Sequence, residues 1–190
     1  MSIDSGRPAS YSPREGMTGE GLAIVERLVR GAGIFTNEEL GVAVEVAEEC
    51  LARGSRSGYH FLWCAAGLDT VGFCCFGPVP LAPGRFELYW IVVDRAVRRK
   101  GVASLLIESA EQRMVRRGCS CVYLDTSSRE QYLPARRLYE KHRYRKEAVL
   151  RDFYADGDHR IIYRKRIGRP VMQRENARDA GRVTAGTIPC

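Results

Sequence analysis

The stretch Arg98-Arg99-Lys100-Gly101-Val102-Ala103 joins an apolar run, Phe86 to Val93, to a helical pattern that begins at Val102. Backbone N–H groups in the first turn of a helix have no partner within that helix, and the helix dipole adds partial positive charge there. A strand, a short basic turn with glycine and a helix N-terminus together form a site for an anion such as phosphate. The next question is which phosphate-bearing molecule this turn binds.

Length and composition are those of one globular domain. The chain has 190 residues, 45% of them apolar and 28% charged, which is enough to bury a core without disulfides. It contains no run of about 18 apolar residues, and its N-terminus is polar, so we expect a cytoplasmic protein without a membrane partner. Residues 1–18 and 168–190 are polar, and we expect them to be flexible tails around a domain of residues 19–167.

The seven cysteines and the net charge of +7 bear on whether the protein binds a metal ion or an anionic partner. The cysteine spacing does not match a metal knuckle and no histidine cluster accompanies it, so we expect reduced cysteines and no metal. The basic residues suit an anionic partner, either a nucleic acid or a phosphorylated small molecule. They are spread along the chain without a nucleic-acid-binding signature, which favours the small molecule. Most of them could equally be solvated surface.

Hydrophobic periodicity and turn signals predict helices and strands in a mixed order. Two helices come first, one from Gly21 to Gly31 or Gly33, and one that begins at the capping box Thr36-Asn37-Glu38-Glu39 and ends at Gly54. Strands are predicted at 59–65, 70–76, 86–93, 119–126, 145–153 and 159–166, and further helices at 102–117 and 132–142. Strand, helix and strand at 86–126 imply a right-handed crossover with parallel pairing. The predicted class is α+β, with a mostly antiparallel sheet.

Two local patterns carry the chemistry. The turn matches neither a P-loop nor a G-x-G-x-x-G fingerprint. It reads R-x-x-G-x-A instead, with Arg98, Gly101 and Ala103 at the defining positions. A second pattern follows the next strand, where residues 132–144 read YLPARRLYEKHRY.

Both patterns resemble signatures of the GNAT superfamily of acyl-CoA-dependent N-acetyltransferases. The first resembles [QR]-x-x-G-x-[GA], and the second resembles N-x-x-A-x-x-L-Y-x-K-x-G-F, with matches at Ala135, Leu138, Tyr139 and Lys141. Tyr132 stands where Asn is usual, and Arg143-Tyr144 replace Gly-Phe. The resemblance covers roughly residues 19–167. It implies a GNAT-like fold whose sheet is flanked by helices and whose central parallel strands splay apart.

The resemblance further implies that acetyl-CoA is the co-substrate. Its pyrophosphate would be bound at the turn by Arg98, Arg99, Lys100, Gly101, Val102, Ala103 and Ser104, through backbone N–H groups from Arg99 to Ser104 and through the three cationic side chains. Gly101 would let the backbone approach the phosphates. The backbone of Ile91, Val92 and Val93 would pair with the pantetheine arm, near which Tyr132 is expected. A solvated basic turn and a purely structural strand are the alternatives.

Acetyl transfer to an amine requires a base, a donor for the oxyanion and a proton for the departing thiolate. The resemblance implies that Tyr139 supplies that proton and that a backbone N–H near Val92 or Val93 stabilises the oxyanion. Glu87 is the candidate base, directly or through water, because an ionisable group in an apolar strand is costly to bury. Tyr139 could instead be a core tyrosine, and Glu87 an exposed carboxylate at a strand end.

The acceptor would be a primary amine of a small molecule or a peptide, attacked directly in a ternary complex. We expect its pocket between Gly33-Ile34-Phe35 and the hairpin at 153–159, with Tyr89, Trp90 and Tyr154 as possible lining. Asp152, Asp156 and Asp158 could attract an ammonium group or could simply form a turn. A homodimer is possible. The alternative function is a non-catalytic acyl-CoA-binding regulatory module on the same fold.

Overall fold

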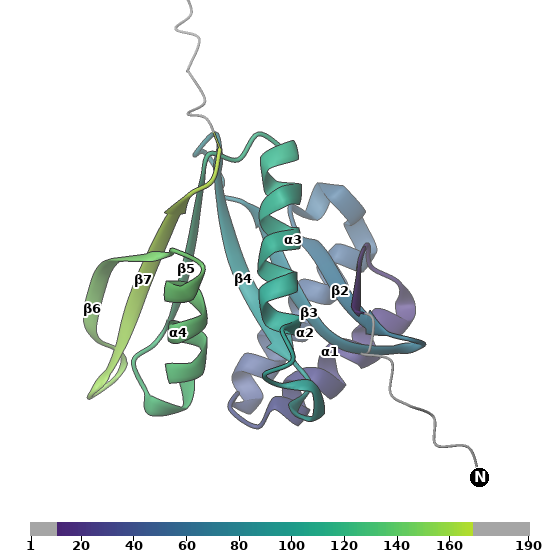
Figure 1. The fold of residues 1–190 in the computed structure, drawn as a ribbon, viewed down its shortest axis with the longest axis horizontal. Coiled ribbons are helices and arrows are strands. Elements are labelled where there is room, and N and C mark those ends of the chain that lie inside the picture. Colours follow the sequence, from purple (N-terminus) through teal and green to yellow (C-terminus); the bar gives the residue numbers. More distant parts are fainter. Residues whose placement is uncertain (1–10, 169–190) are drawn as a thin grey trace, which may run out of the picture.

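The computed structural model describes residues 11–168, which form a seven-stranded sheet of order β1-β2-β3-β4-β5-β7-β6 with helices on both faces (Figure 1). The strands are β1 Tyr11–Glu15, β2 His60–Ala66, β3 Asp69–Pro78, β4 Arg85–Val93, β5 Cys121–Ser127, β6 Arg145–Ala155 and β7 Asp158–Arg166. The α-helices are α1 Gly19–Ala32, α2 Asn37–Arg53, α3 Val102–Arg116 and α4 Leu133–Lys141. Short 3-10 helices are η1 Gly54–Ser57, η2 Arg95–Val97 and η3 Glu130–Tyr132. The mixed, mostly antiparallel class predicted from the sequence is confirmed.

The sheet buries a separate apolar cluster on each of its faces. On one face, α1 and α2 pack with Val25 and Ala47 in a cluster that includes Phe73 of β3. On the other face, α3 contributes Leu106 to a cluster that includes Leu62 of β2. Figure 1 shows α3 in front of the sheet and α1 and α2 behind it. Burial of both faces explains why the central strands have nearly continuous apolar sequences.

Local signals set the ends of the first two helices. Thr36 Oγ1 accepts a hydrogen bond from Glu39 N at 3.1 Å, and Glu39 Oε2 accepts one from Thr36 N at 2.7 Å. This reciprocal pair is the predicted capping box at the start of α2. Gly33 ends α1 with a φ of 60°, in the left-handed region that glycine adopts without strain. The connection between α1 and α2 is therefore short and well defined.

The central parallel pair is short, and this opens the sheet. β4 and β5 share only three residue pairs, from Arg85 with Cys121 to Glu87 with Tyr123. Beyond Glu87 the two strands diverge (Figure 1). A β-bulge at Tyr89 accompanies the divergence, because Cys75 pairs with Trp90 and the next residue of β3 pairs with Leu88. The predicted splay of the central strands is confirmed.

The N-terminal edge of the sheet differs from the prediction. Tyr11–Glu15 forms β1, which pairs antiparallel with β2, although residues 1–18 were expected to be a flexible tail. Glu15 fixes this strand to α3 through ion pairs with Arg113, at 3.0 Å, and Arg117. The polar sequence of this segment does not predict a strand. The strand forms because it pairs with β2, which lies far away in the sequence. The remaining tail predictions, for residues 1–10 and 169–190, lie outside the described residues.

Residues 11–168 contain six free cysteines, all of them buried. Within the same range, no three His, Cys, Asp or Glu side chains cluster in a way that could hold a metal ion. None of the helices in the described part of the chain is long and apolar enough to cross a lipid bilayer.

A buried and an exposed leucine form a matched pair that tests the packing of the core. Leu106 is fully buried under the sheet, whereas Leu68, at the β2–β3 turn, is fully exposed. We expect Leu106→Ala to lower the free energy of unfolding by about 2–5 kcal/mol, because it leaves a cavity in the core. Leu68→Ala should change it by less than about 0.5 kcal/mol. Urea denaturation of both variants measures the difference, and equal effects would contradict the packing described for α3.

Candidate active site

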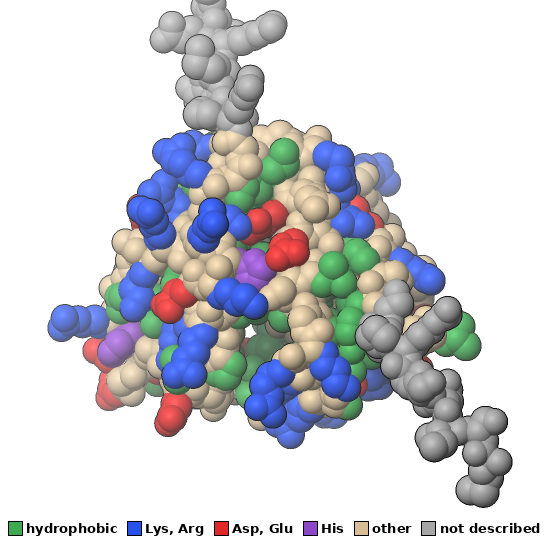
Figure 2. Space-filling view, in the orientation of Figure 1, with side chains coloured by type: hydrophobic (Ala, Val, Ile, Leu, Met, Phe, Trp, Pro, Cys, Tyr) green, Lys and Arg blue, Asp and Glu red, His purple; other side chains and the backbone are tan. Residues whose placement is uncertain are grey.

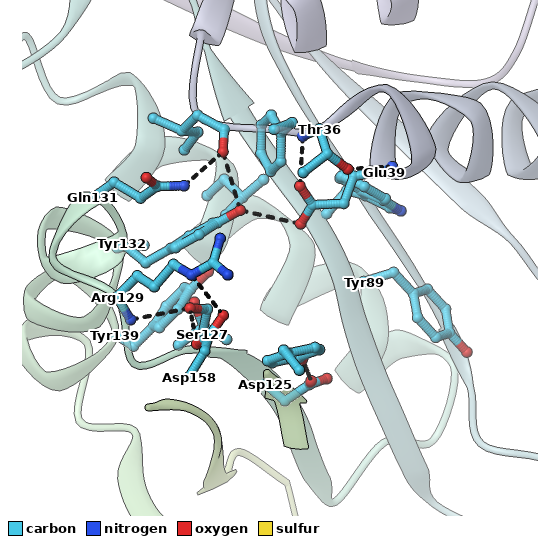
Figure 3. Close-up of a pocket in the computed structure, with 17 residues that line it drawn as sticks. Thr36, Glu39, Tyr89, Asp125, Ser127, Arg129, Gln131, Tyr132, Tyr139 and Asp158 are labelled. Atoms are coloured by element: carbon cyan, nitrogen blue, oxygen red, sulfur yellow. Dashed lines mark hydrogen bonds and ion pairs between the residues drawn. The ribbon is translucent and has the colours of Figure 1, made fainter. Parts of the chain in front are cut away.

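A cavity of about 430 Å³ lies where β4 and β5 diverge (Figure 3). The two strands contribute Tyr89, Trp90, Ile91, Asp125, Thr126 and Ser127, and α4 with the segment before it contributes Arg129, Gln131, Tyr132, Ala135 and Tyr139. The remaining lining consists of Ile34, Phe35, Thr36 and Glu39 beside the α1–α2 connection and Tyr154 and Asp158 from the β6–β7 hairpin. The two walls expected from the sequence therefore both border the cavity. On the face that carries α3 and α4, Figure 2 shows a hollow between α4 and the N-terminal end of α3.

The basic turn has the backbone geometry of an anion site. Gly101, the N-cap of α3, has a φ of 85°, and Arg99 has a φ of 62°. Leu105 N is the first to donate within the helix, to Gly101 O at 3.0 Å, so the N–H groups of Val102–Ser104 have no intrahelical partner. A Cβ on Gly101 would meet no atom within 4 Å, which leaves open space at the helix start. One of the backbone N–H groups predicted to bind the pyrophosphate, that of Lys100, instead donates within the turn, to Val97 O at 3.4 Å.

The structure assigns the side chain of Arg98 a role that the sequence did not suggest. Its Nη2 donates to Ala32 O, the last carbonyl of α1, at 3.1 Å, and Arg95 Nε donates to the same oxygen at 3.1 Å. The C-terminal end of a helix attracts cations, so both guanidinium groups stabilise α1. The Arg98 side chain, which was predicted to contact a phosphate, thus makes a contact within the protein through one of its nitrogens. Arg99 and Lys100 remain exposed at the turn.

The last residues of β4 present a free backbone edge beside the cavity. Ile91, Val92 and Val93 pair with Cys74, Phe73 and Gly72 of β3 on one side. Their other side faces the divergence, and the pairing of β4 with β5 ends at Glu87. Backbone groups on such an edge can bind an extended, amide-containing ligand in the manner of an added strand. Among the three side chains, that of Ile91 lines the cavity.

Tyr139 lies in the cavity wall with its hydroxyl available. The residue is 7% exposed, and its ring packs at 5.8 Å from that of Tyr163 and 6.2 Å from that of Tyr144. Within residues 11–168, no hydrogen bond of its hydroxyl is found. Burial, together with the negative charge of Asp125, raises the pKa of the Tyr139 phenol. The phenol is therefore protonated at neutral pH and can donate a proton.

Glu87 lies beside the cavity rather than in its wall. It is the last residue of β4 that pairs with β5, and it is half-buried. Burial, and then the charge of Asp125, raise the pKa of the Glu87 carboxyl, whereas Arg160 lowers it. A carboxylate with a raised pKa is a stronger base. The structure does not bring Glu87 and Tyr139 together in one cavity wall.

Two cavity-lining carboxylates were not predicted as such from the sequence: Asp125, which no motif marks, and Asp158, for which two roles were left open. Asp125 Oδ2 accepts a hydrogen bond from the Tyr154 hydroxyl at 2.8 Å and forms an ion pair with Arg160 at 2.6 Å. Asp158 is 4% exposed and forms an ion pair with Arg129 at 2.9 Å. The only sequence signal for Asp125 is a carboxylate at the end of an apolar strand.

The other hairpin aspartates differ from Asp158. Asp152 Oδ1 accepts a hydrogen bond from Gly157 N at 2.8 Å, which is the behaviour of a turn residue. Neither Asp152 nor Asp156 lines the cavity. Of these aspartates, Asp152 thus has the contacts of a turn residue, whereas Asp158 lines the cavity.

Tyr132 points toward the α1–α2 connection. Its hydroxyl lies 3.3 Å from Ile34 O and 3.1 Å from Glu39 Oε1, and its ring meets Phe35 edge-on at 6.3 Å (Figure 3). Burial and the neighbouring Glu39 carboxylate raise the pKa of Tyr132 to about 12. The residue lines the cavity, and its hydroxyl is engaged by oxygens of the protein.

Comparison with known proteins finds a family and solved structures with the same fold. The sequence model of the acetyltransferase (GNAT) family matches residues 33–144. A search of curated proteins finds no match. Among solved structures, a GNAT-family protein from Desulfovibrio desulfuricans is 34% identical, with a TM-score of 0.81 over 83% of this chain and 99% of that chain.

Two more distant structures share the fold. The ribosomal-protein-S18-alanine N-acetyltransferase from Escherichia coli is 17% identical, with a TM-score of 0.68 over 86% of this chain and 98% of that chain. The PaiA N-acetyltransferase from Thermoplasma acidophilum, solved in complex with coenzyme A, is 20% identical, with a TM-score of 0.64 over 83% of this chain and 99% of that chain.

The position of the Arg98 side chain leads to a stability prediction. We expect Arg98→Ala to lower the free energy of unfolding by about 0.3–1 kcal/mol, because it removes a cation from the C-terminal end of α1. Lys100→Ala, in the same turn, should leave stability unchanged. Urea denaturation at low ionic strength measures both variants. Equal stability of Arg98→Ala and the parent protein would show that the contact with Ala32 O is not stabilising.

Proposed function

Because this chain belongs to the acetyltransferase (GNAT) family, we propose that it transfers the acetyl group of acetyl-CoA to a primary amine of a small molecule or peptide. The attack is direct, within a ternary complex. The observation that supports this most strongly is the cavity at the divergence of β4 and β5, which lies between a free strand edge and the hydroxyl of Tyr139. A co-substrate and an acceptor can meet in that space.

The residues present fit acetyl-CoA at two successive points. The N–H groups of Val102–Ser104 and the open space at Gly101 suit the pyrophosphate. The free edge of Ile91–Val93 suits the amide groups of the pantetheine arm. The thioester supplies an acyl group that is reactive toward nitrogen nucleophiles. The PaiA structure with bound coenzyme A supports the same fold as a CoA-binding scaffold.

The charge of the cavity supports an amine acceptor. Its lining contains the carboxylates of Glu39, Asp125 and Asp158 and the guanidinium group of Arg129, and Arg160 pairs with Asp125 from outside the lining, so carboxylates still outnumber cations. The chain as a whole carries a formal charge of +7, so this local excess of acid is distinctive. Carboxylates and aromatic faces both attract ammonium groups, which would raise the local concentration of a cationic acceptor. Thiolate or alcohol acceptors gain no such attraction.

Each of the two proton transfers, and the stabilisation of the oxyanion, can be assigned to a group of the protein. Glu87 takes the proton of the acceptor amine through water, since its side chain lies outside the cavity lining. A backbone N–H near Val92 or Val93 stabilises the negative charge on the attacked carbonyl oxygen. Tyr139, whose buried phenol is protonated at neutral pH, donates its proton to the departing sulfur.

Two variants should separate catalysis from co-substrate binding. Tyr139→Phe should keep the acetyl-CoA affinity and lower kcat about 100-fold, as loss of a general acid does. Gly101→Val should instead weaken acetyl-CoA binding at least about tenfold, because valine is strained at a φ of 85° and its side chain occupies the phosphate space. Calorimetric titration with acetyl-CoA gives the affinities, and thiol release across a panel of primary amines gives the rates.

The outcomes of these measurements distinguish the possible functions. Normal turnover by Tyr139→Phe would show that another group protonates the thiolate. Acetyl-CoA binding by the parent protein without thiol release on any amine would favour a non-catalytic acyl-CoA-binding module. No acetyl-CoA binding at tens of micromolar would reject the proposal.

The base assignment predicts a pH dependence. Glu87 must be deprotonated to accept a proton, and burial raises its pKa above the usual value of 4.5. The value of kcat/KM should therefore rise with pH along a limb set by Glu87, and Glu87→Gln should remove that limb and lower the rate about 100-fold. Glu26→Gln, on the exposed face of α1, is the matched control. An unchanged pH profile for Glu87→Gln would assign the base elsewhere.

A further inference from the structure

Two adjacent side chains reach from the segment before α4 to the α1–α2 connection (Figure 3). Gln131 Nε2 donates to Ile34 O at 2.9 Å, and the Tyr132 hydroxyl lies 3.3 Å from the same oxygen. The Tyr132 hydroxyl is also 3.1 Å from Glu39 Oε1. We call Ile34, Glu39, Gln131 and Tyr132 the clasp. It joins residues 93 to 98 positions apart in the sequence.

The clasp is anchored firmly at its α2 end. Glu39 uses its second oxygen, Oε2, to accept the N–H of Thr36 in the capping box, at 2.7 Å. The carboxylate that meets Tyr132 is therefore already oriented by the start of α2. The Tyr132 phenol is protonated at neutral pH and has one proton to donate, which the two nearby oxygens share.

The clasp is continuous with an aromatic wall. The ring of Tyr132 meets Phe35 at 6.3 Å, and Phe35 meets Trp90 of β4 at 5.4 Å. All three rings line the cavity. Figure 3 shows the clasp on one side of the cavity and the group of Asp158, Ser127 and Arg129 on another. The cavity is thus bounded by packed rings and by carboxylates that are already held in place.

We propose that the clasp determines acceptor specificity by closing one side of the cavity, so that slender, unbranched primary amines are acetylated in preference to branched ones. This rests on the proposed acetyl transfer. The cavity of about 430 Å³ must hold both the acyl end of the co-substrate and the acceptor. A branched acceptor would have to displace the ring of Tyr132, which Phe35, Ile34 and Glu39 hold in place. Discrimination by one carbon in an apolar pocket is typically about 10- to 200-fold.

The test compares amines of equal carbon number on clasp variants. For each enzyme, kcat/KM is measured for hexylamine and cyclohexylamine, and for further pairs of unbranched and branched primary amines. The variants are Tyr132→Phe, which keeps the ring without its hydroxyl, and Tyr132→Ala, which removes the wall. Tyr123→Ala is the matched control, because Tyr123 lies on β5 and does not line the cavity. Calorimetric titration with acetyl-CoA is run on every variant.

The parent enzyme should favour the unbranched member of each pair. In Tyr132→Ala the ratio of branched to unbranched kcat/KM should rise at least about tenfold, with a smaller rise in Tyr132→Phe and none in Tyr123→Ala. The affinity for acetyl-CoA should stay within about twofold of the parent value. A merely structural role of Tyr132 would lower both rates and leave their ratio unchanged.

Two results would overturn the inference alone. One is an unchanged ratio in both Tyr132→Phe and Tyr132→Ala while the parent enzyme acetylates amines. The other is a large loss of acetyl-CoA affinity with an unchanged ratio, which would place Tyr132 on the pantetheine arm. Absence of thiol release by the parent enzyme with every amine would reject acetyl transfer itself, and the inference with it.

Discussion

The early end of the β4–β5 pairing is the constraint on which the rest of the site depends. A central strand normally satisfies the backbone groups on both of its edges, yet β4 has β5 beside it only from Arg85 to Glu87. The bulge at Tyr89 turns the strand away at the same place. The divergence creates both the cavity and the unpaired edge of Ile91–Val93. A ligand with alternating amide groups complements such an edge better than any side chain of the protein does.

The two ends of the site have opposite electrostatic character. The start of α3 offers N–H groups and a positive dipole end, whereas the cavity holds more carboxylates than cations. An anionic group and a cationic group of a ligand are therefore drawn to different ends of the site. Arg98 adds to this separation by binding Ala32 O, which ties the turn to α1 without placing its charge at the cavity.

The sequence predicted what local patterns encode. The capping box at Thr36, the glycine turn before α3 and the hairpin at Asp156-Gly157 each lie within a few residues, and the crossover rule then gives the parallel pair. It could not predict contacts whose partners are distant in the chain. Tyr132 meets Glu39 across 93 positions, and Arg98 meets Ala32 across 66. The pairing of β1 with β2 and the place of Glu87 outside the cavity lining likewise follow from tertiary packing.

The buried cysteines have a chemical consequence for the folded chain. Cys74 and Cys75 are fully buried in β3, and burial raises the pKa of both thiols well above the ordinary value. Because the thiolate is the form that reacts with alkylating reagents and oxidants, both residues are chemically inert while the sheet is closed. Modification at these positions therefore requires the central strands to open. These two thiols act as internal reporters of how often the core of the sheet unfolds.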